Sequence, residues 1–200
     1  MKSSKGFTLP EVLVTLGVFL LILTVIGTLL SFGVRQSLRQ NQRSESMRQL
    51  MIQATVLGDQ LRTTAQSSLT LYRPASQKDL HLAFAVPQDE QGRILRDGQQ
   101  LLVYQSYRIW YRKAGSSHLL VSQLPISMPS STPPQPLSPS EIAAAIVARP
   151  GKKVLEQVDS FEALSLHSDS PLTSPQPGFR LRIGLSTDQL SYTQAVRFLR

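Results

Sequence analysis

The chain has 200 residues, a formal net charge of +8 and no cysteine. The absence of cysteine excludes disulfide bonds and thiolate metal sites. The basic surplus is compatible with anionic partners such as lipid headgroups, DNA or acidic protein surfaces, although a solvated basic face produces the same excess.

The N-terminal region contains a long uncharged run, residues 12–34. As a helix this run reaches roughly 35 Å, which is enough to cross a hydrocarbon core of about 30 Å. Lys2 and Lys5 precede it and give it the appearance of a targeting element. The run is longer than the roughly 7 to 15 apolar residues of a secretory signal. We therefore expect a membrane-spanning helix.

A single carboxylate, Glu11, stands at the start of this run. A charged side chain costs about 2.5 kcal/mol or more at the centre of a bilayer and less near its surface. Such a residue is a candidate functional site and needs a partner. We therefore predict that Glu11 makes a specific contact.

The helix is expected to continue beyond the apolar run, over residues 35–73, because no proline occurs between Val34 and Pro74. Apolar residues from Met47 to Ala65 recur mostly at spacings of three and four. This spacing predicts an amphipathic helix docked on another part of the chain.

Three arginines, Arg35, Arg39 and Arg43, follow the apolar run one helical turn apart. Their spacing places them on one face of the predicted helix. Contact with lipid phosphates by snorkelling is the favoured interpretation, and a patch for a specific anionic partner is the alternative.

The sequence pattern of residues 74–200 predicts a β-rich globular head. The hydrophobic period changes from 3.6 to 2 at His81, and turn residues separate the strands that follow. Six prolines between Pro125 and Pro139 predict an extended loop, and a second proline-rich loop is expected over residues 171–177. The strands are expected at residues 81–86, 93–95, 101–113, 118–124, 158–166, 179–185 and 194–200.

A capping box, Ser138-Pro139-Ser140-Glu141, predicts a short helix that ends at Ala148. The expected fold class is therefore α+β. A long N-terminal helix, half membrane-spanning and half amphipathic, packs on an antiparallel β-sheet head.

The sequence contains no constellation that supports catalysis. The three histidines, His81, His118 and His167, lie in or beside different predicted strands, without a carboxylate at ligand spacing. Phosphate-binding glycine loops and nucleophile elbows are also missing. We predict a protein that is not an enzyme and has no catalytic residue, cofactor or metal site.

One strand face, formed by Arg108, Trp110 and Arg112, has the composition of a nucleic-acid surface. Arginine and tryptophan there can contact phosphates and stack on bases. In an antiparallel sheet, such a tryptophan more often packs inward against a helix or a neighbouring strand.

The segment Gly6-Phe7-Thr8-Leu9-Pro10-Glu11-Val12-Leu13-Val14 closely resembles the N-terminal signature of type IV pilins and type II secretion pseudopilins. The resemblance is specific because the matching features follow one another in the same order as in the signature. It extends over residues 1–35, whereas the remainder of the chain resembles the family only in architecture. Pro10 stands where many members carry an aliphatic residue, and proline is tolerated in the first turn of a helix.

The resemblance implies that a prepilin peptidase removes a leader, residues 1–6, by cutting between Gly6 and Phe7, and then methylates the Phe7 amine. It also implies a transmembrane and assembly helix at residues 7–34. The N-terminus would lie in the cytoplasm, and the head in the periplasm or outside the cell. In lipid, the Glu11 carboxylate would pair with the amine of Phe7, its own or a neighbour's.

The resemblance therefore predicts a minor pilin or pseudopilin, loosely similar to the J-type minor pseudopilin. Its expected partners are prepilin peptidase, other pilin subunits, the inner-membrane assembly platform and the lipid bilayer. One alternative is a DNA-contacting minor pilin of a competence pilus. A second alternative, from another class, is a signal-anchored binding domain that is never processed.

Overall fold

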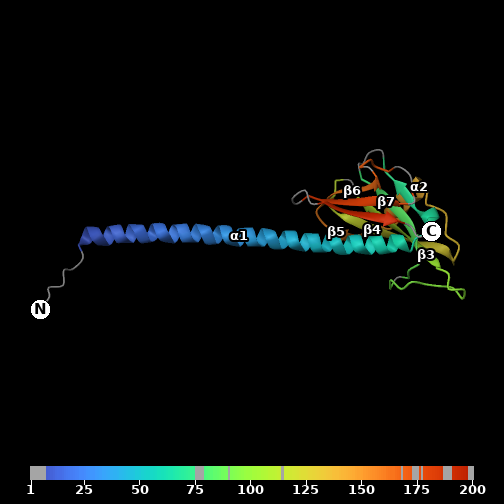
Figure 1. The fold of residues 1–200 in the computed structure, drawn as a ribbon, viewed down its shortest axis with the longest axis horizontal. Coiled ribbons are helices and arrows are strands. Elements are labelled where there is room, and N and C mark those ends of the chain that lie inside the picture. Colours follow the sequence, from blue (N-terminus) through green and yellow to red (C-terminus); the bar gives the residue numbers. More distant parts are fainter. Residues whose placement is uncertain are drawn as a thin grey trace. The chain divides into compact units, whose positions relative to one another are not determined.

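The computed structural model describes residues 8–74, 79–89, 91–113, 115–167, 169–172, 176, 178–186 and 191–197. The chain divides into two units, residues 1–45 and 46–200. One helix, α1 (Leu9–Arg62), contributes residues to both (Figure 1).

The amphipathic part of α1 forms one wall of the core of the second unit. Leu50, Ala54, Leu57 and Leu61 are buried there at spacings of three and four, which confirms the predicted docking stripe. Met51 was expected in the same stripe, but its side chain is 47% exposed because it lies about 100° around the helix from Leu50.

The helix ends at Arg62, well before residue 73, where the sequence analysis expected its end. The hydroxyl groups of Thr63 and Thr64 each donate to the Gln60 carbonyl oxygen at 2.9 Å. The Thr64 hydroxyl also lies 2.9 Å from the Ala85 carbonyl oxygen. Threonine side chains that bond to the backbone compete with helix continuation. A 3-10 turn, η1 (Gln66–Ser68), follows.

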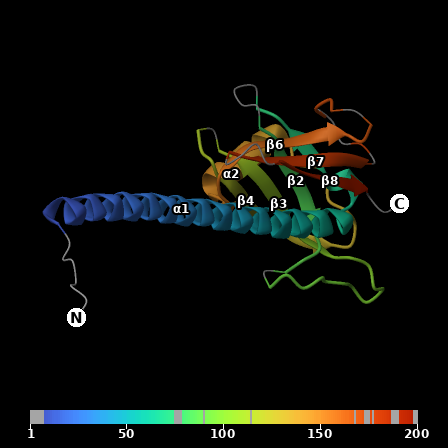
Figure 2. The same ribbon diagram turned by 60° about the vertical axis from the view of Figure 1, so that its left-hand side comes forward.

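The described strands of the second unit form two antiparallel sheets (Figure 2). This arrangement confirms the predicted α+β class, with two sheets where one was expected. The first sheet has the order β1-β2-β3-β4-β5, with β1 (Thr70–Tyr72), β2 (His81–Val86), β3 (Tyr104–Arg112), β4 (Leu119–Ser130) and β5 (Lys152–Leu155). The second has the order β6-β7-β8, with β6 (Val158–Ser165), β7 (Gly178–Leu185) and β8 (Ser191–Arg197).

The five-stranded sheet is covered on both faces, and all six residues of β2 are buried. Leu82 and Phe84 belong to a core shared with α1 and the second sheet. Ala83 and Ala85 belong to a second core, which includes Ile142 of α2 (Pro139–Ala148). Successive side chains of a strand point to opposite faces, so a strand buried on both sides loses the polar alternation of a surface strand.

A β-bulge alters the predicted faces of β3. The register between β3 and β4 shifts between Tyr104 and Ser106. Tyr104 therefore joins the α2 core, whereas strict alternation of side chains would place it on the same face as Trp110. The strand also begins at Tyr104, later than the predicted start at Leu101.

The prediction of an extended loop over residues 125–139 is wrong for the first part of that range. Strand β4 continues through Pro125 and Pro129 to Ser130. The edge strand β5 pairs with β4 only from Leu119 to Val121. Beyond that point, among the described residues, β4 has one open edge, and a strand with an open edge accommodates residues without an N–H group.

The second proline-rich loop, residues 171–177, lies partly outside the described residues. Within its described part, Pro171 forms an isolated bridge with Leu164, and Leu172 is buried. The predicted final strand is present as β8, and residues 198–200 lie outside the described part of the chain.

The predicted capping box of α2 is confirmed. The Glu141 N–H donates to Ser138 Oγ at 3.3 Å, and the Ser138 N–H donates to the Glu141 carboxylate at 2.7 Å. The Ser138 hydroxyl, followed by its N–H, lowers the pKa of Glu141. The local sequence therefore determines where this helix starts.

Replacing the capping serine, Ser138→Ala, is expected to lower the free energy of unfolding by about 1 kcal/mol, because it leaves a helix N–H without its acceptor. Urea unfolding of the full chain in detergent measures this cost. Ser127→Ala, at an exposed position of β4, serves as the control and should change the same quantity by less than about 0.5 kcal/mol. Equal effects of the two substitutions would contradict the capping role.

Candidate functional site

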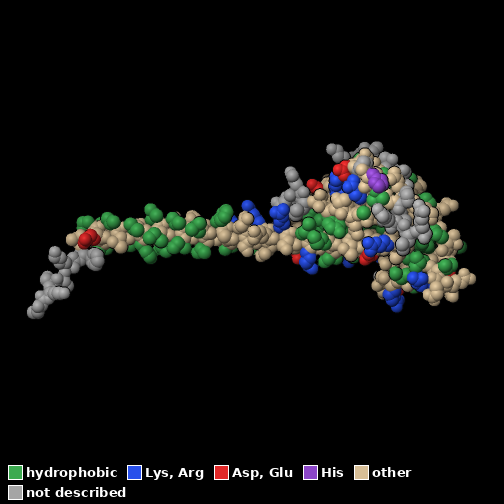
Figure 3. Space-filling model, viewed as in Figure 1, with side chains coloured by type: hydrophobic (Ala, Val, Ile, Leu, Met, Phe, Trp, Pro, Cys, Tyr) green, Lys and Arg blue, Asp and Glu red, His purple; other side chains and the backbone are tan. Residues whose placement is uncertain are grey.

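The first half of α1 exposes an unusual amount of apolar surface. Its most hydrophobic 18-residue window has a mean hydropathy of 2.7, and none of that window is buried within the chain. Leu9 and Phe32 are 78% and 70% exposed. Figure 3 shows hydrophobic side chains along this half of the helix and acidic atoms at its start. Among the described residues, α1 is the only helix long and apolar enough to span a membrane.

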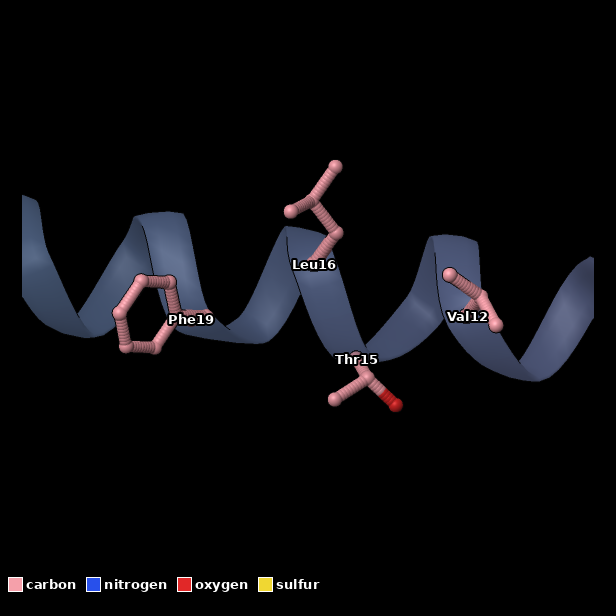
Figure 4. A pocket seen from close by; sticks show the side chains of 4 residues that line it. All are labelled: Val12, Thr15, Leu16 and Phe19. Carbon is pink, nitrogen blue, oxygen red and sulfur yellow. The ribbon is translucent and has the colours of Figure 1, made fainter. Parts of the chain in front are cut away.

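One face of this helix has a shallow hollow of about 360 Å³, lined by Val12, Thr15, Leu16 and Phe19. These positions follow the i, i+3, i+4, i+7 pattern of a single helix face. Figure 4 shows the four side chains along the helix, with Thr15 contributing the one hydroxyl group. A hollow with this lining can receive a lipid chain or an apolar side chain of another helix.

The Glu11 carboxylate is held by the residue before the helix. Its Oε2 accepts from the Thr8 backbone N–H and from the Thr8 hydroxyl, each at 2.9 Å. The Glu11 carbonyl oxygen accepts from the Thr15 hydroxyl at 2.7 Å. The acid therefore has a defined position at the first turn of α1.

Thr8 is a site residue that the sequence analysis missed. The order Thr8-x-x-Glu11, immediately before an apolar run, is a capping-box pattern that could have identified it. In the structure Thr8 satisfies one carboxylate oxygen of Glu11 locally. Such a contact reduces the cost of holding an acid at the edge of an apolar segment.

Gly6 and Phe7, the predicted cleavage and methylation positions, lie outside the described residues, as does the leader, residues 1–6. The cleavage, the methylation and the pairing of Glu11 with the Phe7 amine therefore stay predictions. The structure describes the acid of this site and its Thr8 contact.

Arg35, Arg39 and Arg43 lie on consecutive turns of α1 with exposed side chains. Arg35 is about 36 Å from Glu11 along the helix axis, at about 1.5 Å per residue. This separation is close to the thickness of a bilayer including part of its headgroups. The arrangement places an acid at one end of the apolar segment and a basic face at the other.

The strand face predicted for nucleic-acid stacking is not available. Trp110 is 1% exposed and belongs to the core that includes Leu57. Arg112 Nη2 forms a salt bridge with Asp79 Oδ2 at 2.6 Å. Base stacking needs an exposed ring, so the inward-packed arrangement of Trp110 is confirmed.

The described residues contain no group of three or more His, Cys, Asp or Glu residues that could hold a metal ion. His81 lies between the rings of Tyr72 and Tyr111, at centroid distances of 5.8 and 5.6 Å. Burial lowers the pKa of His81, against the opposing effect of Asp79. His81 is therefore a neutral aromatic residue of the core at neutral pH.

Residues 1–27 match the family model of the prokaryotic N-terminal methylation motif. Comparison with curated proteins and with solved structures returned no match. The chain thus carries the signature of type IV pilins and pseudopilins, which marks structural proteins that are not enzymes. The motif and the apolar helix indicate a membrane-anchored, single-pass protein with a prepilin-type N-terminus, and the motif implies contact with prepilin peptidase and other pilin subunits.

Proposed function

We propose that the chain is a minor pilin or pseudopilin that enters a type IV pilus or a type II secretion pseudopilus through the first half of α1. The observation that carries this proposal is the position of the methylation motif at the start of an exposed apolar helix with one acid. Exposed apolar surface of this extent requires lipid or partner helices to cover it. A pilin encounters both, first in the membrane and then in the filament.

In this proposal, prepilin peptidase cuts between Gly6 and Phe7 in the inner membrane. The new amine at Phe7 is methylated and carries a positive charge. It lies four residues from Glu11, within reach of the carboxylate on the same or a neighbouring chain. Lys2 and Lys5 stay in the cytoplasm with the leader, and the head lies in the periplasm or outside the cell.

The pairing of Glu11 with the amine of a neighbouring chain attracts the two subunits and fixes the axial position of one helix relative to the other. An acid in lipid is penalised until it is paired, so a subunit gains stability when its helix reaches the depth at which the two charges meet. The contact joins different surfaces of the two chains, and repeated addition through such a contact generates a helical filament. The apolar hollow beside Val12 and Phe19 offers packing space for the adjacent helix.

A minor role, at the tip or during initiation, fits the head better than a major role does. The head has long proline-containing segments and no cysteine pair. The loose similarity to J-type pseudopilins, from Tyr104 to Leu120 and in the late strands, points in the same direction. The competing DNA-contacting role loses its aromatic platform because Trp110 is buried.

The N-terminus of the mature protein tests the proposal directly. Mass spectrometry of the protein purified from its native membrane should find Phe7 as the first residue, with one added methyl group. The same preparation from cells without prepilin peptidase should retain Met1 and is the control. An intact Met1 in the normal host would favour a signal-anchored binding domain, and a cut near residue 34 would identify a secreted protein.

A further inference from the structure

A second hollow, of about 580 Å³, lies within the unit of residues 46–200, beside the edge strand β5. Four basic residues and two glutamines provide most of its polar lining, namely Arg108, Arg149, Lys152, Lys153, Gln53 and Gln123. This volume falls in the range of small-molecule sites, about 300 to 1,000 Å³. We refer to this hollow as the basic pocket.

The fold creates the basic pocket where the pairing of β4 with β5 stops. Val121 is the last β4 residue paired with β5, opposite Lys152. The chain reaches β5 through a turn at Arg149, Pro150 and Gly151, and the Ser122 hydroxyl donates to the Arg149 carbonyl oxygen at 2.7 Å. The turn is therefore fixed against the open edge of β4.

Gly151 allows this turn to approach the sheet closely. Its N–H donates to the Tyr111 hydroxyl oxygen at 3.0 Å. A Cβ at this position would lie 3.0 Å from the Val121 carbonyl carbon, which is closer than ordinary contact. The backbone that presents Arg149 and Lys152 is consequently packed against β3 and β4.

The basic pocket has an excess of positive charge. Among the residues that the structure describes, its lining contains no aspartate or glutamate. Lys153 pairs with Glu156, whose carboxylate is outside the lining. Arg108 is partly buried, and its Nε has no hydrogen-bond partner among the described residues. Burial lowers the pKa of Arg108. A buried cation without a compensating charge is costly, and an anion bound beside it offsets that cost.

We propose that the basic pocket binds the phosphoryl group of a small phosphate ester, with Arg108, Arg149 and Lys152 facing the phosphoryl oxygens. A phosphate dianion matches several converging cations better than a single carboxylate does, and arginine binds its oxygens through two N–H groups. Val121 and Val154 line the remainder and provide aliphatic surface for the organic part. The ester can be a free metabolite or the headgroup of phosphatidic acid, since both are phosphate monoesters.

Calorimetric titration of the full chain with glycerol 3-phosphate, in phosphatidylcholine nanodiscs and a phosphate-free buffer, tests this site. Saturable binding at one site per chain is expected. Arg149→Gln and Lys152→Gln should each weaken it about tenfold, the effect of losing one charge-assisted hydrogen bond. The side chains of Arg149 and Lys152 are exposed, so both substitutions should leave the fold intact. Lys113→Gln removes one exposed positive charge elsewhere on the same unit and should not change the affinity.

Adding phosphatidic acid to the nanodiscs distinguishes the two sources of ester. Weaker apparent binding of glycerol 3-phosphate would assign the pocket to a lipid headgroup, and unchanged binding would assign it to a soluble ester. Absence of saturable binding, or equal losses from Arg149→Gln and Lys113→Gln, would overturn the proposal. Displacement of glycerol 3-phosphate by a DNA duplex, with steep salt dependence, would also overturn it and assign the surface to a nucleic-acid backbone.

Discussion

Glu11→Ala protein is expected to lose its leader as the wild-type chain does, yet to enter filaments at least about tenfold less often. The cleavage site at Gly6 and Phe7 precedes the acid and is unchanged. The substitution removes the carboxylate that would pair with the amine of a neighbouring chain. The amine is then left in lipid without its counter-charge, which costs several kcal/mol.

Quantitative immunoblotting of sheared filaments against the membrane fraction measures this loss, and mass spectrometry of the membrane fraction reports processing. Thr24→Val serves as the matched control. Thr24 lies in the same apolar run, outside the lining of the hollow, and its hydroxyl donates to the Leu20 carbonyl oxygen at 2.8 Å. We expect normal incorporation of that variant, because the acid is retained.

Glu11→Gln separates charge from hydrogen bonding. A glutamine oxygen can still accept from the Thr8 N–H and hydroxyl, as Glu11 Oε2 does at 2.9 Å. If the charge pair drives assembly, the Glu11→Gln variant should enter filaments nearly as rarely as the Glu11→Ala variant. Normal incorporation of Glu11→Ala would reject the charge-pair mechanism, and normal incorporation of Glu11→Gln alone would replace it by a neutral hydrogen bond.

Features of the fold with local causes could be predicted from the sequence. The capping box at Ser138 fixes the start of α2 through side chains three residues apart. The stripe of Leu50, Leu57 and Leu61 follows from helical periodicity alone. The apolar run after Glu11 needs only its length and its lack of charge to indicate a membrane helix.

Features that depend on distant contacts could not be predicted in this way. Strand β5 is four residues long and becomes a strand by pairing with β4. The bulge at Tyr104 depends on the register of β3 against β4, which no local pattern near Tyr104 encodes. The burial of both faces of β2 requires α1 on one side and α2 on the other.

The two candidate sites also differ in whether the local sequence reveals them. The acid of the first site is visible in the sequence because a carboxylate at the start of an apolar run is rare. The basic pocket combines Gln53, Arg108, Arg149 and Lys152 from segments far apart in the chain. Each of these residues alone resembles an ordinary surface residue, so only the folded chain brings the charges together.

Asp79→Ala is expected to lower the free energy of unfolding by about 3 to 5 kcal/mol, because it leaves the Arg112 guanidinium without its counter-charge. Asp79 is 5% exposed, and its Oδ2 lies 2.6 Å from Arg112 Nη2. Arg112 Nη1 also donates to the carbonyl oxygens of Ser116 and Val158, at 3.0 and 3.3 Å. The pair therefore links β3 to the start of β6 in the second sheet.

Asp59→Ala provides the matched control, since Asp59 pairs with Arg62 on the surface of α1 at 3.3 Å. Both side chains of that pair are more than 60% exposed, so the expected cost is under about 1 kcal/mol. Urea unfolding of the full chain in detergent, followed by fluorescence, measures both variants, because Trp110 is the only tryptophan and lies in the core.

Replacing both partners, Asp79→Ala with Arg112→Met, should recover part of the lost stability. The double variant removes the unpaired charge and retains an apolar side chain of similar length. If Asp79→Ala and Asp59→Ala lowered the free energy of unfolding by equal amounts, a stabilising role for the buried pair would be contradicted. A double variant less stable than Asp79→Ala alone would instead assign the stability to the Arg112 bonds with Ser116 and Val158.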